Sequence, residues 1–463
     1  MNNRLVYWLL SLIALTPAVP VLAAVHHYQI AIDAGTQTLR VRGEFSTDIY
    51  KLHARESELS GLRALRHCSG RELRVRRGRI SSSEPIRCFQ YQYQIKPPKR
   101  DDRVRLPGDV FASSPSEWLW IPKLGKTDEI VIRLQLPRDV SVSVPWRQTD
   151  AGYVLNASPE SGTGVVFFGN LLQQKLQLKN RQLRVTLIPN PETSEQAEKM
   201  FTWLAAAAQD VEEVSGAFPI PSPQVVVIAS EPPMGGGAVP FGHVIRDGGE
   251  SVRFYVNAEH PLEDFMKDWT ATHEFAHLLL PYVRSKQKWV SEGFASYYQN
   301  ILLARRGIYT EIQAWQKLHR AFHKAETIDN PPTPNNAHRR DFWEVRMLVY
   351  WSGAAMALLA DTQLRELSGG EESLDTVLSR FQSCCLPAQS VWSAEAFFAK
   401  LDALTKYPVF SELFSDIGDQ RGMPATDFTF ARLGIVTEGE KVIRLTDDAP
   451  LANLRRKIMN GES

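Results

Sequence analysis

One stretch of the sequence combines two histidines with a glutamate, and it reads Thr272-His273-Glu274-Phe275-Ala276-His277-Leu278. The residues between and after the histidines are apolar, which predicts a buried helix over residues 262–280 that ends at Pro281. On such a helix, four residues at ~100° each bring the second histidine to within ~40° of the first. Both imidazoles can therefore reach one metal ion, while Glu274 points beside that face.

This H-E-x-x-H pattern has a direct chemical interpretation, in which His273 and His277 bind one Zn²⁺ and Glu274 is the general base. Zinc lowers the pKa of a bound water towards ~7, and a nearby carboxylate accepts the proton as the water attacks. The alternative is a pair of core histidines hydrogen-bonded to the backbone. Burying these groups without partners would be costly.

A catalytic zinc site needs a third protein ligand and leaves the fourth position for water. Glu292 is the candidate, and we expect it at the start of the next helix, in the segment Trp289-Val290-Ser291-Glu292-Gly293-Phe294-Ala295-Ser296-Tyr297-Tyr298. Its surroundings are aromatic and small residues, among which an unpaired charge would be unfavourable. The alternative is a glutamate favoured only by the dipole of a helix N-terminus.

The pattern along the chain predicts an α+β multidomain protein. Short alternating runs over residues 25–190 indicate an N-terminal β-sandwich-like domain, and Thr193 opens a helix. Residues 191–305 form the catalytic domain, with strands near 224–228 and 252–256 on either side of a glycine-rich loop at 232–249. Residues 306–463 are mostly helical, with one or two strands over 428–445 and a frayed tail.

The N-terminus and the cysteines indicate where the protein resides. Residues 1–24 have the basic start, apolar stretch and small final residues of a secretory signal, so we expect a periplasmic or secreted protein without stable membrane insertion after cleavage. The alternative is an uncleaved anchor in the inner membrane. A bridge between Cys68 and Cys88 is plausible after export, whereas Cys384 and Cys385 are as easily two buried thiols as a bridge.

Charge argues against nucleic acid as a partner, because 53 basic residues balance 52 acidic ones with no long run of one sign. The expected partner is a peptide substrate. Composition is otherwise ordinary for a globular protein of this length.

The residues around the metal motif resemble the gluzincin metallopeptidases, in particular the glycyl aminopeptidase family and its relative aminopeptidase N. The likeness is carried by H-E-x-x-H, by W-x-x-E-G-F-A-x-Y-Y, and by the segments around Tyr350 and Ser373-Leu374-Asp375. It implies a thermolysin-like catalytic domain, zinc ligands at His273, His277 and Glu292, and Tyr350 as the hydroxyl that stabilises the oxyanion. For Tyr350 the alternative is an ordinary core aromatic.

Three features depart from that family. Its aminopeptidases bind the substrate amine with a glutamate in a glycine-rich strand, but residues 235–243 here contain no acid. Gly235, Gly236 and Gly237 remain candidates for backbone pairing with a peptide. Ser352 stands where the family usually has lysine, and the segment after Arg421 is too short for the PDZ domain that often follows.

Three functions therefore compete. The first is an exported zinc peptidase, aminopeptidase-like or cutting short peptides internally. The second is a catalytically weak or inactive peptide-binding protein that retains the gluzincin fold, suggested by the missing glutamate. The third is a metal-dependent hydrolase acting on other peptides, such as the stem peptides of the cell wall.

Overall fold

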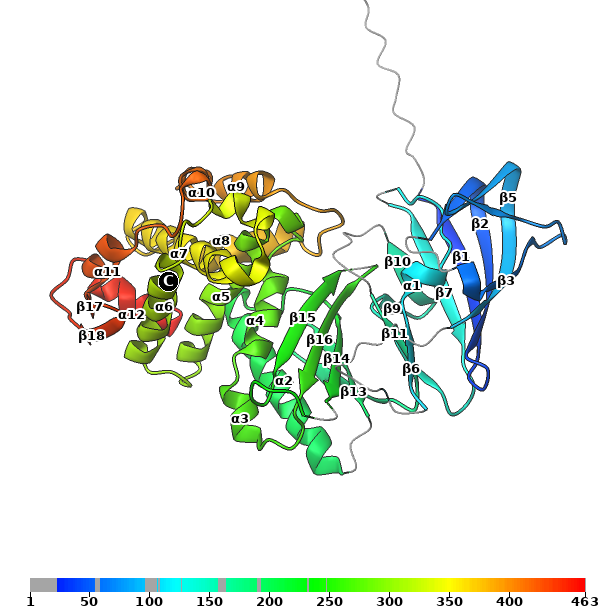
Figure 1. Ribbon diagram of the computed structural model, residues 1–463, viewed down its shortest axis with the longest axis horizontal. Coiled ribbons are helices and arrows are strands. Elements are labelled where there is room, and N and C mark those ends of the chain that lie inside the picture. The colour runs from blue at the N-terminus through cyan, green and yellow to red at the C-terminus, as the bar shows by residue number, and fades with distance from the viewer. Residues whose placement is uncertain are drawn as a thin grey trace, which may run out of the picture.

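The computed structural model describes residues 23–54, 59–95, 106, 109–125, 127–156, 164–189, 193–230, 233–246 and 248–462. The expected signal segment lies outside this part of the chain, apart from Ala23 and Ala24. Within the described residues, no helix is both long and apolar enough to cross a bilayer. Figure 1 shows a β-rich region at one end, a second sheet in the middle and a helical region at the other end.

The β-rich region consists of two sheets. The larger has the order β3-β5-β2-β1-β7-β10-β9, with β4 paired to β5, and the smaller has the order β6-β11-β8. The strands of the larger sheet are β1 (Val25–Asp33), β2 (Thr38–His53), β3 (Leu62–His67), β4 (Val75–Arg76), β5 (Arg79–Gln94), β7 (Glu129–Gln135), β9 (Arg147–Thr149) and β10 (Gly152–Asn156). Those of the smaller are β6 (Phe111–Ser113), β8 (Ser141–Ser143) and β11 (Val166–Gly169), and two short helices, η1 (Leu59–Gly61) and α1 (Pro115–Trp118), complete the region. The packing of both sheets on one core matches the expected sandwich-like domain.

The smaller sheet connects the β-rich region to the rest of the protein. Successive side chains of a strand point to opposite faces, so the side chains of β11 pack into two different cores. Val166 and Phe168 pack with the larger sheet, whereas Phe167 packs with Ile188 and Val226 of the central sheet. The β11 strand therefore holds the two regions together.

The central sheet has five strands in the order β12-β13-β14-β16-β15. They are β12 (Leu172–Gln177), β13 (Gln182–Ile188), β14 (Gln224–Ala229), β15 (Phe241–Arg246) and β16 (Glu250–Val256). The expected domain boundary at residue 190 is too late, because β13 pairs in parallel with β14 and so belongs to this sheet. The expected loop over 232–249 is also partly wrong, since it contains the edge strand β15, antiparallel to β16.

Helices α2 (Ser194–Ser215), α3 (Leu262–Lys267) and α4 (Thr270–Ala276) accompany this sheet. Thr193 caps α2 by accepting from the Gln196 N–H, as the sequence predicted. The single helix expected over 262–280 is instead broken at Asp268 and Trp269, and it ends in a 3-10 turn, η2 (His277–Leu279). The Asp268 side chain accepts from the Thr270 N–H and so starts α4 afresh.

The C-terminal region is helical, as expected. Its elements are η3 (Ser285–Gln287), α5 (Lys288–Arg305), α6 (Glu311–Glu326), η4 (Pro334–Arg339), α7 (Phe342–Leu367), α8 (Leu374–Cys385), α9 (Ala394–Asp402), α10 (Phe410–Asp419), α11 (Asp427–Leu433), β17 (Ile435–Glu438), β18 (Lys441–Leu445) and α12 (Ala452–Asn460). The one or two strands predicted over 428–445 are β17 and β18, but the start of that stretch lies in the helix α11. The tail forms α12, with Ile458 and Met459 buried. The prediction of a frayed tail was wrong because this amphipathic segment packs its apolar face against the core.

One apolar core runs from Leu176 on β12 to Met459 on α12. The described residues of the C-terminal region, 306–462, therefore share a core with the central sheet. Cys68 and Cys88 form a disulfide, and so do the neighbouring Cys384 and Cys385.

Candidate metal centre

The two histidines and Glu292 converge on one point. His273 lies on α4, His277 begins η2, and Glu292 comes from α5. The Nε2 atoms of His273 and His277 each lie 3.5 Å from Oε2 of Glu292, and the three ligand atoms all lie within 4.8 Å of one another. Zinc bonds of 2.0–2.1 Å in tetrahedral geometry would separate ligand atoms by about 3.3 Å, so the donor set fits a zinc ion.

Each histidine is oriented by a hydrogen bond from its other ring nitrogen. Nδ1 of His273 lies 2.7 Å from Oε1 of Gln299, and Nδ1 of His277 lies 2.9 Å from Oγ of Ser291. Such a partner selects the tautomer that leaves Nε2 free for a metal. Neither partner was predicted from the sequence, although Gln299 follows Glu292 by seven residues and so shares its face of α5.

Glu292 occupies the second turn of α5, not the first turn expected from the sequence. The helix dipole therefore explains its position poorly, because that effect fades beyond the first turn. Burial by itself would raise the pKa of Glu292, but hydrogen bonds from His273 and His277 outweigh burial and hold the pKa well below its ordinary range. The carboxylate is thus held charged against the two imidazoles.

Glu274 is a buried carboxyl on α4, with 8% of its surface exposed. Burial raises its pKa to about 7, opposed by the attraction of His273 and by a hydrogen bond from the Val244 N–H of β15. A carboxyl of this kind can accept and return a proton near neutral pH. The edge strand therefore holds the side chain that we expect to act as base.

Gly242 on β15 makes room for Glu274. A Cβ atom at this position would lie 2.7 Å from Cγ of Glu274. Gly235, Gly236 and Gly237, which the sequence suggested for substrate binding, lie in the segment before β15, and the Asn257 side chain donates to the Gly237 carbonyl at 2.6 Å. The glycine closest to Glu274 is thus Gly242, which the sequence had not suggested as a functional residue.

Tyr350 comes from α7 and stacks on the His273 ring, with 6.0 Å between ring centroids. Its hydroxyl is hydrogen-bonded to Glu292, and burial, followed by the negative charges of Glu292 and Glu274, raises its pKa above the ordinary value. The phenol is therefore kept protonated and able to donate a hydrogen bond. Its position at the cluster argues against an ordinary core aromatic.

Two glycines set the distance between α5 and α7. A Cβ atom on Gly293 would lie 2.2 Å from Cα of Gly353, and a Cβ atom on Gly353 would lie 2.2 Å from the Trp289 carbonyl oxygen. The helices therefore touch through their backbones at this crossing. Glu292 directly precedes Gly293, and Tyr350 lies one turn before Gly353. The helix crossing therefore sets the distance between the Glu292 and Tyr350 side chains.

Comparisons with known proteins find similarity to aminopeptidases, in sequence over a short segment and in fold over most of the chain. A family model described as M61 glycyl aminopeptidase matches residues 279–333, which include Glu292. An aminopeptidase N family protein from Idiomarina loihiensis is similar in structure, with a TM-score of 0.62, 14% identity, and coverage of 88% of this chain and 78% of that one.

A two-domain M1 zinc metallopeptidase bound to L-arginine is also similar, with a TM-score of 0.53, 11% identity, and coverage of 87% of this chain and 94% of that one. The comparison with curated proteins found no significant match. The resemblance to the glycyl aminopeptidases and to aminopeptidase N is therefore confirmed, and the solved structures show the same α+β fold with a β-rich N-terminal region and a helical C-terminal region.

Proposed function

We propose that the protein is a zinc-dependent peptidase with a gluzincin centre in a thermolysin-like catalytic domain. The observation that carries the proposal is the convergence of His273 Nε2 and His277 Nε2 on the Glu292 carboxylate, with Glu274 buried beside them. Two histidines and a glutamate are the ligand set of one known class of catalytic zinc site. The metallopeptidase named among the structural relatives supports the choice of metal.

His273, His277 and Glu292 would hold one zinc ion, which when bound polarises both a water molecule and the carbonyl group of the substrate. Glu274 removes a proton from the attacking water and returns it to the leaving amine. Tyr350 donates a hydrogen bond to the oxygen on which negative charge develops, a contribution of several kcal/mol in comparable sites. Together these steps break the peptide C–N bond and add one water molecule, which gives a carboxylate and a free amine.

The edge strand β15 supplies a place for the peptide backbone. It is the last strand of its sheet, and it also donates the Val244 N–H to Glu274. An extended peptide could add to this edge next to the general base. Since residues 235–243 carry no acid, this strand has no carboxylate for an N-terminal amine, and both aminopeptidase-like and internal cleavage remain part of the proposal.

A second candidate is a peptide-binding protein with weak or no catalysis, which the same missing acid favours. In either case we propose that the protein is exported, to the periplasm or outside the cell. The signal-like residues 1–24 support this location, as do the two disulfides, since disulfides persist in oxidising compartments. An uncleaved N-terminal segment is the alternative form of the exported protein.

The deciding experiment combines metal analysis with turnover. Purified protein should carry one zinc per chain and cut members of a mixed peptide library, mapped by mass spectrometry with free and N-acetylated peptides. Glu274→Gln should keep the zinc and lose at least about 1,000-fold in kcat/KM, because the proton acceptor is gone. Glu412→Gln, the same change at an exposed position of α10, serves as the control.

Loss of cutting on N-acetylation identifies an aminopeptidase, and cutting that survives acetylation identifies internal cleavage. Full activity of Glu274→Gln would refute the mechanism. Binding of peptides by the zinc-loaded protein without any cutting would instead favour the second candidate.

A further inference from the structure

A cavity of about 360 Å³ lies between the start of α5 and the start of α7. This volume falls within the range of about 300–1,000 Å³ for small-molecule sites. Its floor includes Trp289, Phe342 and Val349, and its basic residues include Lys286, Lys288 and Arg340. We call it the Lys288 pocket. None of the described residues that line it is acidic.

The Lys288 pocket adjoins the metal centre. Lys288 precedes the ligand Glu292 by four residues on α5, so the two lie on one face of the helix, about 6 Å apart along its axis. On the α7 side, the rings of Phe342 and Tyr350 are in contact, with 6.3 Å between centroids. Successive residues of an extended peptide are about 3.3–3.6 Å apart, so a residue one or two positions from the reacting bond can reach the pocket.

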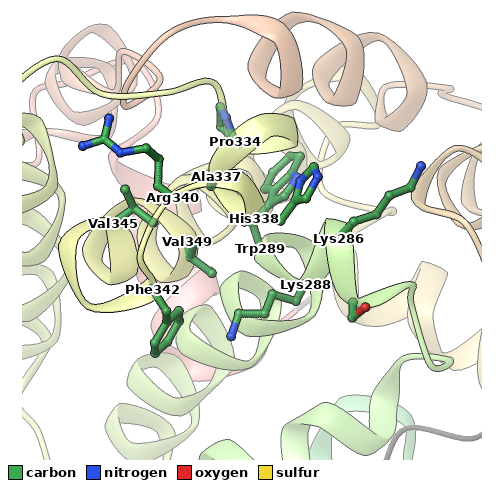
Figure 2. Close-up of a pocket in the computed structure, with 11 residues that line it drawn as sticks. Lys286, Lys288, Trp289, Pro334, Ala337, His338, Arg340, Phe342, Val345 and Val349 are labelled. Atoms are coloured by element: carbon green, nitrogen blue, oxygen red, sulfur yellow. The ribbon is translucent and has the colours of Figure 1, made fainter.

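Lys288 is the cation best placed to receive a ligand. Its Nζ lies 3.8 Å from the centroid of the Phe342 ring, and the side chain is half-buried. Figure 2 shows its ammonium turned towards Phe342, while the charged ends of Lys286 and Arg340 stand at opposite sides of the view. Among the described residues no carboxylate lies within ion-pair distance of Lys288, whereas Arg340 is 3.1 Å from Glu344.

We propose that the Lys288 pocket binds a carboxylate of the peptide substrate, and this inference rests on the proposed peptidase function. An ammonium held on an aromatic ring, partly shielded from water and without a described carboxylate within ion-pair distance, attracts an anion more strongly than a fully exposed lysine does. The apolar floor accepts the aliphatic part of the residue that carries the anion. A peptide offers this group either as an acidic side chain or as its C-terminal carboxylate.

The test measures binding to the zinc-loaded Glu274→Gln protein, so that it does not depend on turnover. The probes are alanine-based pentapeptides with one glutamate at each position in turn, each paired with its glutamine version, with free and amidated C-termini. We expect one carboxylate, in a side chain or at the C-terminus, to tighten binding about tenfold over its neutral version. The glutamate series and the amidated series distinguish the two sources.

Adding Lys288→Met should remove that preference, while Lys288→Arg should retain it. Lys441→Met, an equivalent change at an exposed position of strand β18, should leave it unchanged. Thermal unfolding checks that each variant is folded. The inference is overturned if no carboxylate improves binding, or if the preference survives Lys288→Met.

Turnover of the same peptides by the unmodified protein separates this inference from the proposed function. Hydrolysis without a carboxylate preference refutes carboxylate binding by the Lys288 pocket and leaves the proposed peptidase function intact. A Lys288-dependent preference in binding without hydrolysis of any peptide supports the pocket and refutes the peptidase.

Discussion

Gly293→Ala tests whether the contact between α5 and α7 positions the metal centre. The added Cβ would lie 2.2 Å from Cα of Gly353 and 2.3 Å from its carbonyl carbon, where ordinary contact begins at 3.4 Å. These obstacles are backbone atoms and cannot rotate away, so the helices must separate by about 1 Å. Glu292 moves with one helix and Tyr350 with the other.

The expected cost of Gly293→Ala has two parts. Overpacking of this kind lowers the free energy of unfolding by about 1–3 kcal/mol. A displacement of about 1 Å in a catalytic arrangement can lower kcat/KM about 100-fold. Zinc binding should weaken as well, because metal sites tolerate only about 0.2 Å in ligand distances.

The assay compares Gly293→Ala with Gly35→Ala, which adds the same methyl group in ordinary contact with its nearest neighbour at 3.6 Å. Thermal and urea unfolding, zinc content and kcat/KM are measured for both variants. We expect Gly35→Ala to behave as the unmodified protein. A Gly293→Ala protein with unchanged stability, zinc content and turnover would refute the proposed role of this helix crossing.

Two further substitutions test the surroundings of the metal. Gln299→Leu removes the partner of His273 Nδ1 and should weaken zinc binding about 10–100-fold, measured by competition with a chelator; unchanged affinity would contradict the orienting role. Gly242→Ala should keep the zinc but lower kcat about 10–100-fold, because its Cβ would displace Glu274; equal loss of zinc and turnover would point to general disruption instead.

Much of the metal centre was predictable from local spacing. His273 and His277 are four residues apart, and a helical turn brings such residues to one face whatever surrounds them. The break at Asp268 did not disturb this, because both histidines follow it and the turn at His277 keeps helical backbone angles. Glu292 was predictable only from its unusual apolar surroundings and from the family resemblance.

Other parts of the centre depend on contacts between distant segments. Gly242 and Glu274 meet because β15 is the edge strand of its sheet. The alternation of apolar residues within one strand does not reveal which strands are its neighbours. The many glycines of residues 232–249 predicted a loop instead of this strand. Likewise, β12 and β13 were assigned to the N-terminal domain because alternation identifies a strand without identifying its sheet.

The sequence by itself determined the candidate metal-binding residues, their spacing along the chain and the alternation of the β-rich region, because these follow from the local geometry of helices and strands. Only the tertiary structure decided how closely α5 approaches α7, which side chains orient the histidines, and which aromatic ring of α7 meets Lys288 of α5. These features depend on packing between segments far apart in sequence. At Gly293, for example, a Cβ atom would lie 2.2 Å from Cα of Gly353, and local helix propensity does not reveal this contact.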